Sequence, residues 1–507
     1  MSEMQQYQRL YTTFSHHGTL IYAGTLLERA AHLFPEHVAL IVGQEHITYR
    51  QLYTAACALS VHLVARNIKP RDRVLILYEN GVNFYRSYFG AWQTGAIVIP
   101  VNTLLHEQEI QHIIDDAAPH AVLISNKLAA KMPALTRATK HFIITEDELE
   151  TVATAPHRTY QSEKLELDEM SVLLYTSGTT GTPKGVMLSS NNIMNAIIQG
   201  AARFNFTTQE RIYCALPLFH SFTQSTCVWA STAFGGTVII VPQVNRTQLL
   251  EGLQHKPTII LGVPGLYALF CRLKGVQFDH ARYIISGGDA LTDKVRMYFE
   301  LLFGRKICNG YGLTETSPFI SVNFDDSVAP THTVGTPFIN VQCQIRDGSP
   351  IGVLWIKGPN IMLGYYNAPD ATKKVLQDGW LNTGDLAMIG ADGKIILYGR
   401  EKELIVVKGV KIYPQEVENL LMSHPQVMAA AVVGVHDASN EEFPVAYIIW
   451  RGEPIPTTSD ALRAFCSKHL APYKIPRTFI IRETLPLTAT GKIDKKELVK
   501  QYQQSID

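Results

Sequence analysis

The chain has no excess of charge of either sign. Its 507 residues contain 45 Lys and Arg against 45 Asp and Glu, so the formal net charge is zero. Proteins that bind nucleic acid through its phosphates usually carry a basic surplus. The charge balance therefore gives no indication of a nucleic-acid partner.

Cysteine is scarce, and long apolar runs are missing. The seven cysteines are scattered and form no CxxC pair, so we expect neither a disulfide framework nor a thiolate zinc site. No uncharged apolar run approaches the about 20 residues that span a bilayer, and the polar start "MSEMQQYQRL" lacks the apolar core of a signal peptide. We predict a cytoplasmic protein with reduced thiols.

Apolar residues make up 46% of the chain and charged residues 18%, as in ordinary globular proteins. Short apolar runs rich in β-branched residues predict buried strands. These runs cover residues 73–79, 96–102, 121–125, 237–242, 258–264 and 281–288. Between them lie helical patterns such as residues 49–67, with apolar side chains at three- and four-residue steps. This alternation predicts an α/β protein with parallel sheets covered by helices.

The pattern changes near residue 400. The segment 401–425 predicts a short hairpin followed by a helix that begins near Pro414. The rest is small and mixed, and its end is rich in lysine. We place a domain boundary here, with a large α/β domain over 1–400 and a small α+β domain over 401–507.

The stretch "YTSGTTGTPKGVMLSS" (175–190) combines glycines, hydroxyl side chains and one lysine. It is not a Walker P-loop, because Lys184 follows a proline and precedes a glycine instead of Ser or Thr. Glycines still allow backbone N–H groups to form an anion-binding nest, to which hydroxyls and a lysine add donors. We therefore predict a phosphate-binding loop.

Further motifs follow in a fixed order. They are "LPLFHSF" (216–222), "SGGDAL" (286–291), "NGYGLTET" (309–316), "LNTGDLA" (381–387), "YGREKELIVVKGVKIYPQEVE" (398–418) and "LPLTATGKI" (485–493). Together with the first loop, they resemble the adenylate-forming superfamily, which includes acyl-CoA synthetases, coumarate ligases, luciferases and peptide-synthetase adenylation domains. The resemblance covers about residues 20 to 500.

The resemblance implies a two-step ligase with a mobile small domain. A carboxylate attacks the α-phosphate of ATP, which gives an acyl-adenylate and pyrophosphate. The thiol of CoA then takes the acyl group and releases AMP. The implied cofactors are ATP, Mg²⁺ and CoA, and attack of one anion on another requires charge neutralisation.

The resemblance also assigns roles on the nucleotide side. Glu315 is the implied Mg²⁺ ligand together with Thr179, and Thr314 and Lys184 are placed at the phosphates. Asp385 would accept both ribose hydroxyls and Arg400 would lie on the ribose or phosphate side, while Tyr311 would stack on adenine. The remaining implied nucleotide contacts are Thr176, Ser177, Gly178, Thr180, Gly181, Gly288, Asp289, Asn309 and Gly312.

Three further sites come from the same resemblance. Lys492 is the implied adenylation lysine, and Lys402 is the hinge about which the small domain rotates. Lys408 and Gly409 would border the thiol tunnel, where glycine permits close approach of a pantetheine arm. The implied acyl-site residues are His220, Phe222, Thr223, Gly262 and Gly335.

The sequence departs from fatty-acyl-CoA ligases at Thr223, where glycine is common and a branched side chain would narrow an acyl channel. A second departure is Gly265, where threonine is common. The histidines of "HEQEIQH" (106–112) are six residues apart and do not form a HExxH metal motif.

Several alternatives stay open. We favour an apolar medium- or long-chain acid, with aryl acids as a second choice, and free CoA as acceptor over a carrier-protein pantetheine arm. A non-catalytic acyl- or nucleotide-binding protein is the least favoured. A homodimer and peripheral membrane contact also stay open.

Overall fold

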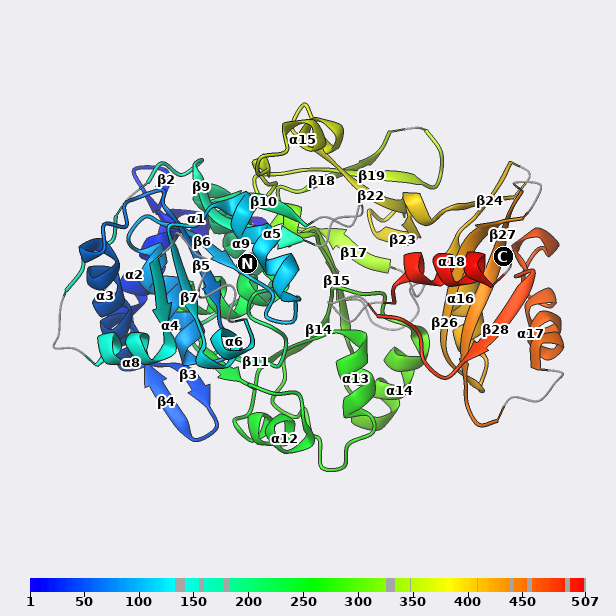
Figure 1. Ribbon diagram of the computed structural model, residues 1–507, viewed down its shortest axis with the longest axis horizontal. Helices are drawn as coiled ribbons and strands as arrows, with labels where there is room; N and C mark the ends of the chain where they lie inside the picture. The colour runs from blue at the N-terminus through cyan, green and yellow to red at the C-terminus, as the bar shows by residue number, and fades with distance from the viewer. Residues whose placement is uncertain are drawn as a thin grey trace.

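A computed structural model describes residues 1–132, 142–154, 159–163, 165–176, 183–324, 333–346, 348–407, 409–437, 441–453, 458–487 and 493–505. It has a large α/β domain and a small domain beside it, which lies on the right in Figure 1. The predicted fold class, a large N-terminal domain of layered sheets with a small α+β C-terminal domain, is confirmed.

The first sheet is seven-stranded within the described residues, in the order β20-β10-β9-β6-β5-β7-β8. Its strands are β5 (Arg73–Leu77), β6 (Ile97–Pro100), β7 (Ala121–Ile124), β8 (Phe142–Thr145), β9 (Met170–Thr176), β10 (Lys184–Ser189) and β20 (Gly364–Tyr365). The strands from β9 to β8 are parallel, whereas β10 and β20 are antiparallel additions. The β9–β10 hairpin therefore carries the predicted phosphate loop between its strands.

The second sheet is 14-stranded in the described part of the chain. One half is mostly parallel and contains β3 (Val38–Val42), β4 (Glu45–Thr48), β11 (Arg211–Cys214), β12 (Thr237–Ile240), β13 (Ile259–Gly262), β14 (Tyr283–Ser286) and β15 (Cys308–Tyr311). The other half is antiparallel and contains β16 (Ser321–Asn323), β17 (Thr333–Pro337), β18 (Gln342–Ile345), β19 (Gly352–Lys357), β21 (Leu376–Gln377), β22 (Trp380–Ile389) and β23 (Ile395–Arg400).

All six predicted strands are present, as β5, β6, β7, β12, β13 and β14, and the predicted helix over 49–67 is α3 (Tyr49–Ala65). The expectation of parallel sheets is wrong for the mixed second sheet. In its antiparallel half, β22 and β23 are joined by the short turn over 390–394, and such short connections pair neighbouring strands antiparallel.

Helices cover both sheets (Figure 1). Besides α3, the described part of the large domain has the helices α1 (Glu3–Thr13), α2 (Leu26–Leu33), α4 (Val82–Trp92), α5 (Glu107–Ala117), α6 (Asn126–Lys131), α8 (Glu146–Ala153), α9 (Ser190–Phe204), α10 (Ser221–Thr223), α11 (Ser231–Phe234), α12 (Arg246–Gln254), α13 (Pro264–Phe270), α14 (Asp293–Phe303) and α15 (Pro369–Val375). Short 3-10 turns are η1 (Ala23–Thr25) and η3 (Thr314–Thr316), and η2 (Gln224–Ala230) is a π-helix. A small hairpin, β1 (Ser15–His16) and β2 (Thr19–Leu20), lies near the N-terminus.

The small domain begins after the 3-10 turn η4 (Glu401–Glu403). Its elements are β24 (Ile405–Val407), β25 (Val410–Ile412), α16 (Pro414–Ser423), β26 (Val427–His436), β27 (Glu442–Trp450), α17 (Thr458–Ser467), η5 (Pro472–Lys474), β28 (Thr478–Arg482) and α18 (Lys495–Gln504). The predicted hairpin and the helix at Pro414 are both present. Lys294 of the large domain donates to the carbonyl of Val427 at 2.7 Å, which joins the two domains.

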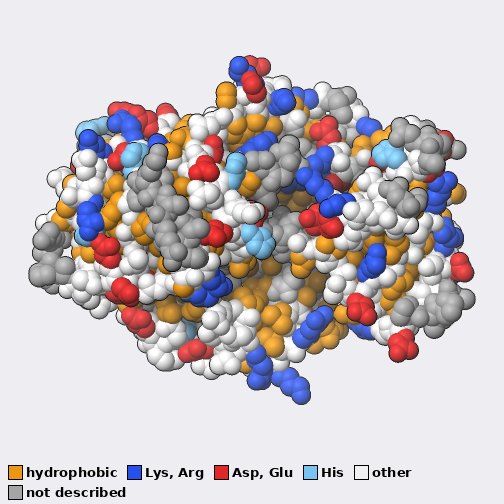
Figure 2. Space-filling model, in the orientation of Figure 1, with side chains coloured by type: hydrophobic (Ala, Val, Ile, Leu, Met, Phe, Trp, Pro, Cys, Tyr) orange, Lys and Arg blue, Asp and Glu red, His pale blue; other side chains and the backbone are white. Residues whose placement is uncertain are grey.

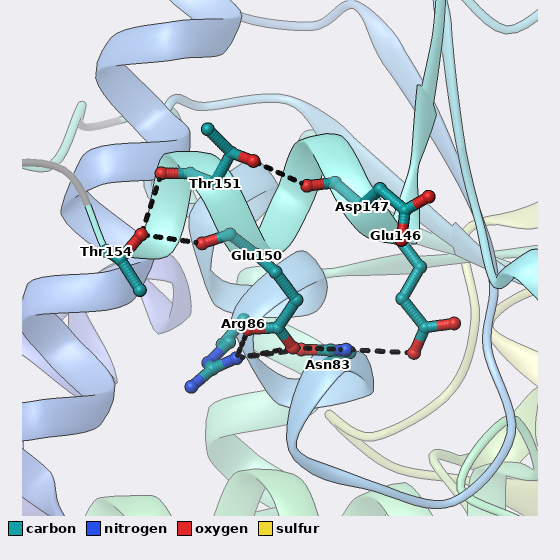
Figure 3. A network of polar contacts seen from close by, with 7 residues as sticks. All are labelled: Asn83, Arg86, Glu146, Asp147, Glu150, Thr151 and Thr154. Carbon is teal, nitrogen blue, oxygen red and sulfur yellow. Dashed lines mark hydrogen bonds and ion pairs between the residues drawn. The ribbon is translucent and has the colours of Figure 1, made fainter.

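A polar network lies where α4 meets α8 (Figure 3). The Glu150 carboxylate accepts from Arg86 at 2.9 Å and from Asn83 at 2.9 Å, and Asn83 also donates to Glu146 at 3.1 Å. These residues line a cavity of about 290 Å³ at the carboxyl ends of β5 and β8. Because Glu146 and Glu150 already have partners on α4, we assign the network the role of fastening α8 to α4.

The distribution of charged side chains on the surface agrees with the balanced charge of the sequence, and the helices agree with the lack of long apolar runs. Basic and acidic side chains are interspersed over the face drawn in Figure 2. Within the described residues, no helix has both the length and the apolar character needed to cross a bilayer.

Candidate active site

Part of the predicted nucleotide site lies at the carboxyl ends of β14 and β15, where Tyr311 contacts Asp385 of β22. This edge is where α/β sheets commonly bind ligands. The loop after β14 contains Gly288, which has φ of +80°. Such a left-handed conformation favours glycine.

Asp385 is held from two sides. It is 6% exposed, and its Oδ1 atom lies 2.7 Å from Nε of Arg400. The hydroxyl of Tyr311 donates to its Oδ2 atom. The two strands set this up, because Asp385 on β22 and Arg400 on β23 are directly paired. One carboxylate is therefore fixed where the resemblance places the ribose.

The groups around Asp385 change the pKa values of Tyr311 and Arg400. Burial raises the pKa of Tyr311 well above its usual value, and the neighbouring Asp385 charge raises it further. Burial alone would lower the pKa of Arg400, but the combined attraction of Asp385, Tyr311, Glu315 and Glu403 outweighs it and the pKa is raised. Tyr311 thus stays a hydrogen-bond donor and Arg400 stays a cation.

Glu315, Tyr365 and Lys184 form a second group. The Tyr365 hydroxyl donates to Oε1 of Glu315 at 2.8 Å, and the Lys184 ammonium lies 5.3 Å from the centre of the Tyr365 ring. The turn η3 carries Glu315, and its carbonyl accepts from the backbone N–H of Met362 at 2.9 Å. A carboxylate with one oxygen oriented by a hydroxyl, near a lysine, fits the donor chemistry that Mg²⁺ and phosphates require.

The segment 216–222, the acyl loop, carries the predicted acyl-site residues His220 and Phe222 and contacts the turn η3. The hydroxyls of Ser221 and Thr314 lie 3.0 Å apart. The Nδ1 atom of His220 accepts from the backbone N–H of Phe222 at 3.2 Å, so this nitrogen carries no proton in that hydrogen bond. A Cβ at Gly287 would lie 3.1 Å from the Phe222 ring. The loop after β14, the acyl loop and the "GLTET" turn are therefore in contact.

Two amide side chains, those of half-buried Asn80 and of Gln224, hold the acyl loop in place. Asn80 donates to the carbonyl of Leu216 at 2.9 Å and accepts from the N–H of Leu218 at 2.8 Å. Gln224, which is fully buried, donates to the carbonyl of Phe219 at 2.9 Å. These contacts hold His220 between two anchored points.

The remaining acyl-site residues are tightly packed. Thr223 is fully buried, and its hydroxyl has no hydrogen-bond partner among the described residues. A Cβ at Gly262 would lie 2.6 Å from the Tyr267 ring, and one at Gly335 would lie 2.1 Å from the carbonyl oxygen of Val322. In this structure none of the three side-chain positions opens into free space.

Asn309 and Asp289 lie at the same edge of the second sheet, whereas Thr176 lies in the first sheet. Asn309 on β15 donates to the carbonyl of Thr333 at 3.2 Å, and the Asp289 carboxylate accepts from the N–H of Ala290 at 2.8 Å. Thr176 ends β9 opposite Lys184, to whose carbonyl it donates at 3.5 Å. Their contacts to a nucleotide stay a prediction.

Several predicted residues lie outside the described residues. They are Ser177, Gly178, Thr179, Thr180 and Gly181 of the first loop, Lys408 of the predicted thiol tunnel, and Lys492. Gly409 is described: it has φ of +80°, and a Cβ there would meet no atom within 4 Å. Lys402 is exposed in η4, directly after β23.

Residue-by-residue reasoning missed Tyr365, Ser221 and Asn80. Tyr365 follows Gly364 in "LGYYNAP", where two adjacent tyrosines beside a glycine were the available signal. Ser221 lies within a recognised motif but had no assigned role. Asn80 lies 136 residues before Leu216, and nothing in the sequence pairs these distant segments.

A family model described as "AMP-binding enzyme" matches residues 27–366, and a second, "AMP-binding enzyme C-terminal domain", matches residues 416–492. The chain belongs to the AMP-binding enzyme family. The prediction of an enzyme of the adenylate-forming superfamily, an acid–thiol ligase, is confirmed.

Curated relatives of this AMP-binding enzyme cover nearly the whole chain. A long-chain-fatty-acid–CoA ligase from Salmonella typhimurium is 29% identical and covers 95% of each chain. A feruloyl-CoA synthase from an Amycolatopsis species is 31% identical and covers 94% of this chain and 98% of its own. A 2-succinylbenzoate–CoA ligase from Bacillus subtilis is 29% identical, with 93% and 96% covered.

Solved structures give the same fold. ATP-bound MatB from Rhodopseudomonas palustris has a TM-score of 0.87 and 26% identity, and covers 96% of this chain and 100% of its own. The Bacillus subtilis o-succinylbenzoate CoA synthetase, in complex with its acyl-adenylate intermediate, has a TM-score of 0.85 and 28% identity, with 94% and 97% covered.

Gly312→Ala is expected to abolish activity by distorting the turn that carries Glu315. A Cβ at Gly312 would lie 1.5 Å from the carbonyl oxygen of Pro318, so the backbone must move. Gly265→Ala is the matched control, because its Cβ would meet no atom within 4 Å. AMP release and thermal unfolding would be measured for both, and wild-type activity in Gly312→Ala would contradict the assignment.

Proposed function

We propose that this AMP-binding enzyme activates an apolar carboxylic acid with ATP and transfers the acyl group to the thiol of CoA. The observation that carries the proposal is the Asp385 carboxylate, held between Arg400 and Tyr311 next to the Glu315 group. A fixed, charged acceptor beside a metal-binding carboxylate suits a nucleotide with its ribose at one end and its phosphates at the other.

Each side chain has a proposed task in the first step. Asp385 accepts the ribose hydroxyls and orients the nucleotide, and Tyr311 packs against the base. Glu315 would hold Mg²⁺, which when bound neutralises phosphate charge. Lys184 and the first loop bind the released pyrophosphate end, and Thr314 lies at the α-phosphate, where the Ser221 contact joins it to the acyl loop.

Two lysines of the C-terminal part are proposed to act in sequence with the domain motion. Lys492 offsets the charge that gathers as the carboxylate meets the α-phosphate, which lowers the barrier without tightening ground-state binding. Rotation about Lys402 then brings Lys408 and Gly409 to the thiol tunnel. The domains proposed for this motion are 1–400 and 401–507.

The acid is proposed to be a medium- or long-chain fatty acid. Support comes from the apolar Phe222 beside Gly287 and from the similarity to a fatty-acid–CoA ligase. The feruloyl and 2-succinylbenzoate relatives favour an aryl acid as the second candidate. A cytoplasmic location and a homodimer accompany the proposal.

AMP release with ATP, Mg²⁺ and CoA would test the proposal over acids from acetate to oleate, with ferulate, benzoate and 2-succinylbenzoate included. The expected result is CoA-dependent AMP release that peaks with one aliphatic class. If AMP release required a holo-carrier protein instead of CoA, the acyl acceptor would be the pantetheine arm of that protein. No AMP with any acid would contradict the function.

Lys402→Pro is expected to leave adenylation largely intact and to suppress thioester formation. Proline fixes φ near −65° and removes a rotatable dihedral at the proposed hinge. ATP–pyrophosphate exchange and acyl-CoA formation would be measured separately, with Lys402→Ala as control. An equal loss of both half-reactions would contradict the hinge role.

A further inference from the structure

Lys495 lies between two carboxylates of the small domain. Its Nζ atom is 2.9 Å from Oε2 of Glu403 and 2.8 Å from Oε1 of Glu418. Glu418 is 7% exposed and also accepts from the backbone N–H of Val432 at 2.8 Å. Burial would lower the pKa of Lys495, but Glu418 and Glu403 outweigh it and raise the pKa, so the side chain stays cationic.

The three residues come from distant segments. Glu403 belongs to η4, next to the proposed hinge at Lys402, Glu418 lies on α16, and Lys495 is the first residue of α18. The ion pairs therefore join the start of α18 both to the hinge segment and to the body of the small domain.

The start of α18 follows a short antiparallel pairing, the stem, which joins residues 486–487 to residues 493–494. Leu487 and Ile493 form an antiparallel bridge, and the N–H of Asp494 donates to the carbonyl of Pro486 at 2.8 Å. The Asp494 carboxylate caps α18 by accepting from the N–H groups of Lys496 and Glu497. The stem directly precedes Lys495, and Lys492 is adjacent to Ile493 in sequence.

We propose that Lys495 is a positioning residue for adenylation, and this rests on the proposed function. Its ion pairs with Glu403 and Glu418 fix the stem relative to the hinge segment. Rotation of the small domain then brings Lys492, which precedes the stem residue Ile493 in sequence, to the α-phosphate. Without Lys495, two carboxylates would face each other without a cation, and their repulsion would release the stem.

Loss of Lys495 is expected to slow adenylation and to leave thioester formation unchanged. Adenylation needs a lysine placed at the α-phosphate, and a misplacement of about 1 Å can cost up to about 100-fold in rate. Thioester formation from a supplied acyl-adenylate does not use that lysine in the proposed scheme. ATP and acid bind to the large domain, so their KM values do not depend on the stem.

The test compares Lys495→Met, Lys495→Arg and the exposed control Lys500→Met in both half-reactions. For Lys495→Met we expect ATP–pyrophosphate exchange with a kcat lowered about 10- to 100-fold, KM values within threefold of wild type, and thioester formation from synthetic acyl-adenylate within threefold. Lys495→Arg should restore most of the exchange because it keeps the cation, and Lys500→Met should behave as wild type.

An equal fall in both half-reactions, or wild-type exchange in Lys495→Met, would overturn the proposal. If Lys495→Met does not fold, Glu403→Gln serves instead, since it removes the hinge-side pair and leaves Glu418 paired; unchanged exchange in that variant would also overturn it. Absence of exchange in the wild-type enzyme would instead contradict the proposed function, so the two failures are distinguishable.

Discussion

Asp385→Ala is expected to raise the KM for ATP by roughly 100-fold or more. Hydrogen bonds to a charged group contribute about 1.5–3 kcal/mol each, and the proposed ribose site loses two of them. The substitution also leaves Arg400 and Tyr311 without their shared acceptor. Initial rates of AMP release over a range of ATP concentrations would measure the change.

Asp385→Asn is the matched control, because it keeps the shape and one acceptor oxygen but loses the charge. We expect an intermediate KM for ATP, with the KM for the acid close to wild type in both variants. If Asp385→Ala raised only the KM for the acid, the carboxylate would belong to the acyl site and the ribose assignment would be wrong.

Lys492→Ala is expected to lower carboxylate-dependent ATP–pyrophosphate exchange by about 100- to 1,000-fold, the usual cost of losing one donor that stabilises transition-state charge. Acyl transfer from a supplied acyl-adenylate to CoA should change little. Isotope exchange and a thioester assay on the same preparation would separate the two half-reactions.

Lys500→Ala is the control for Lys492→Ala, since this exposed lysine of α18 belongs to the same basic segment. It should retain wild-type exchange. Near-normal exchange in Lys492→Ala would show that another cation acts in the first step. It would also contradict the proposal that the small domain rotates to bring Lys492 to the α-phosphate.

The parallel strands were predictable because each is a short, buried, β-branched run between helical segments. β5, β7 and β13 are almost fully buried along their lengths, and that burial produces the continuous apolar pattern. The antiparallel half of the second sheet was not predicted, because strands such as β22 mix buried and partly exposed residues with functional ones.

Only the candidate-site residues that lie within recognisable motifs were predictable from the sequence. Asp385, Arg400 and Glu315 each lie in a recognisable stretch, and the fold brings their surroundings together. The contacts that orient them come from residues with weak local signals: Tyr365 acts on Glu315, and Asn80 acts on the acyl loop across the two sheets. Such cross-sheet hydrogen bonds depend on tertiary packing, which one sequence does not display.

A crystal structure with a non-hydrolysable acyl-adenylate mimic tests the central claim most directly. We expect the ribose hydroxyls to bind Asp385, the base to lie beside Tyr311 and Gly288, and the acyl group to enter past Phe222. A ligand bound away from Asp385 and the β9–β10 hairpin would contradict it.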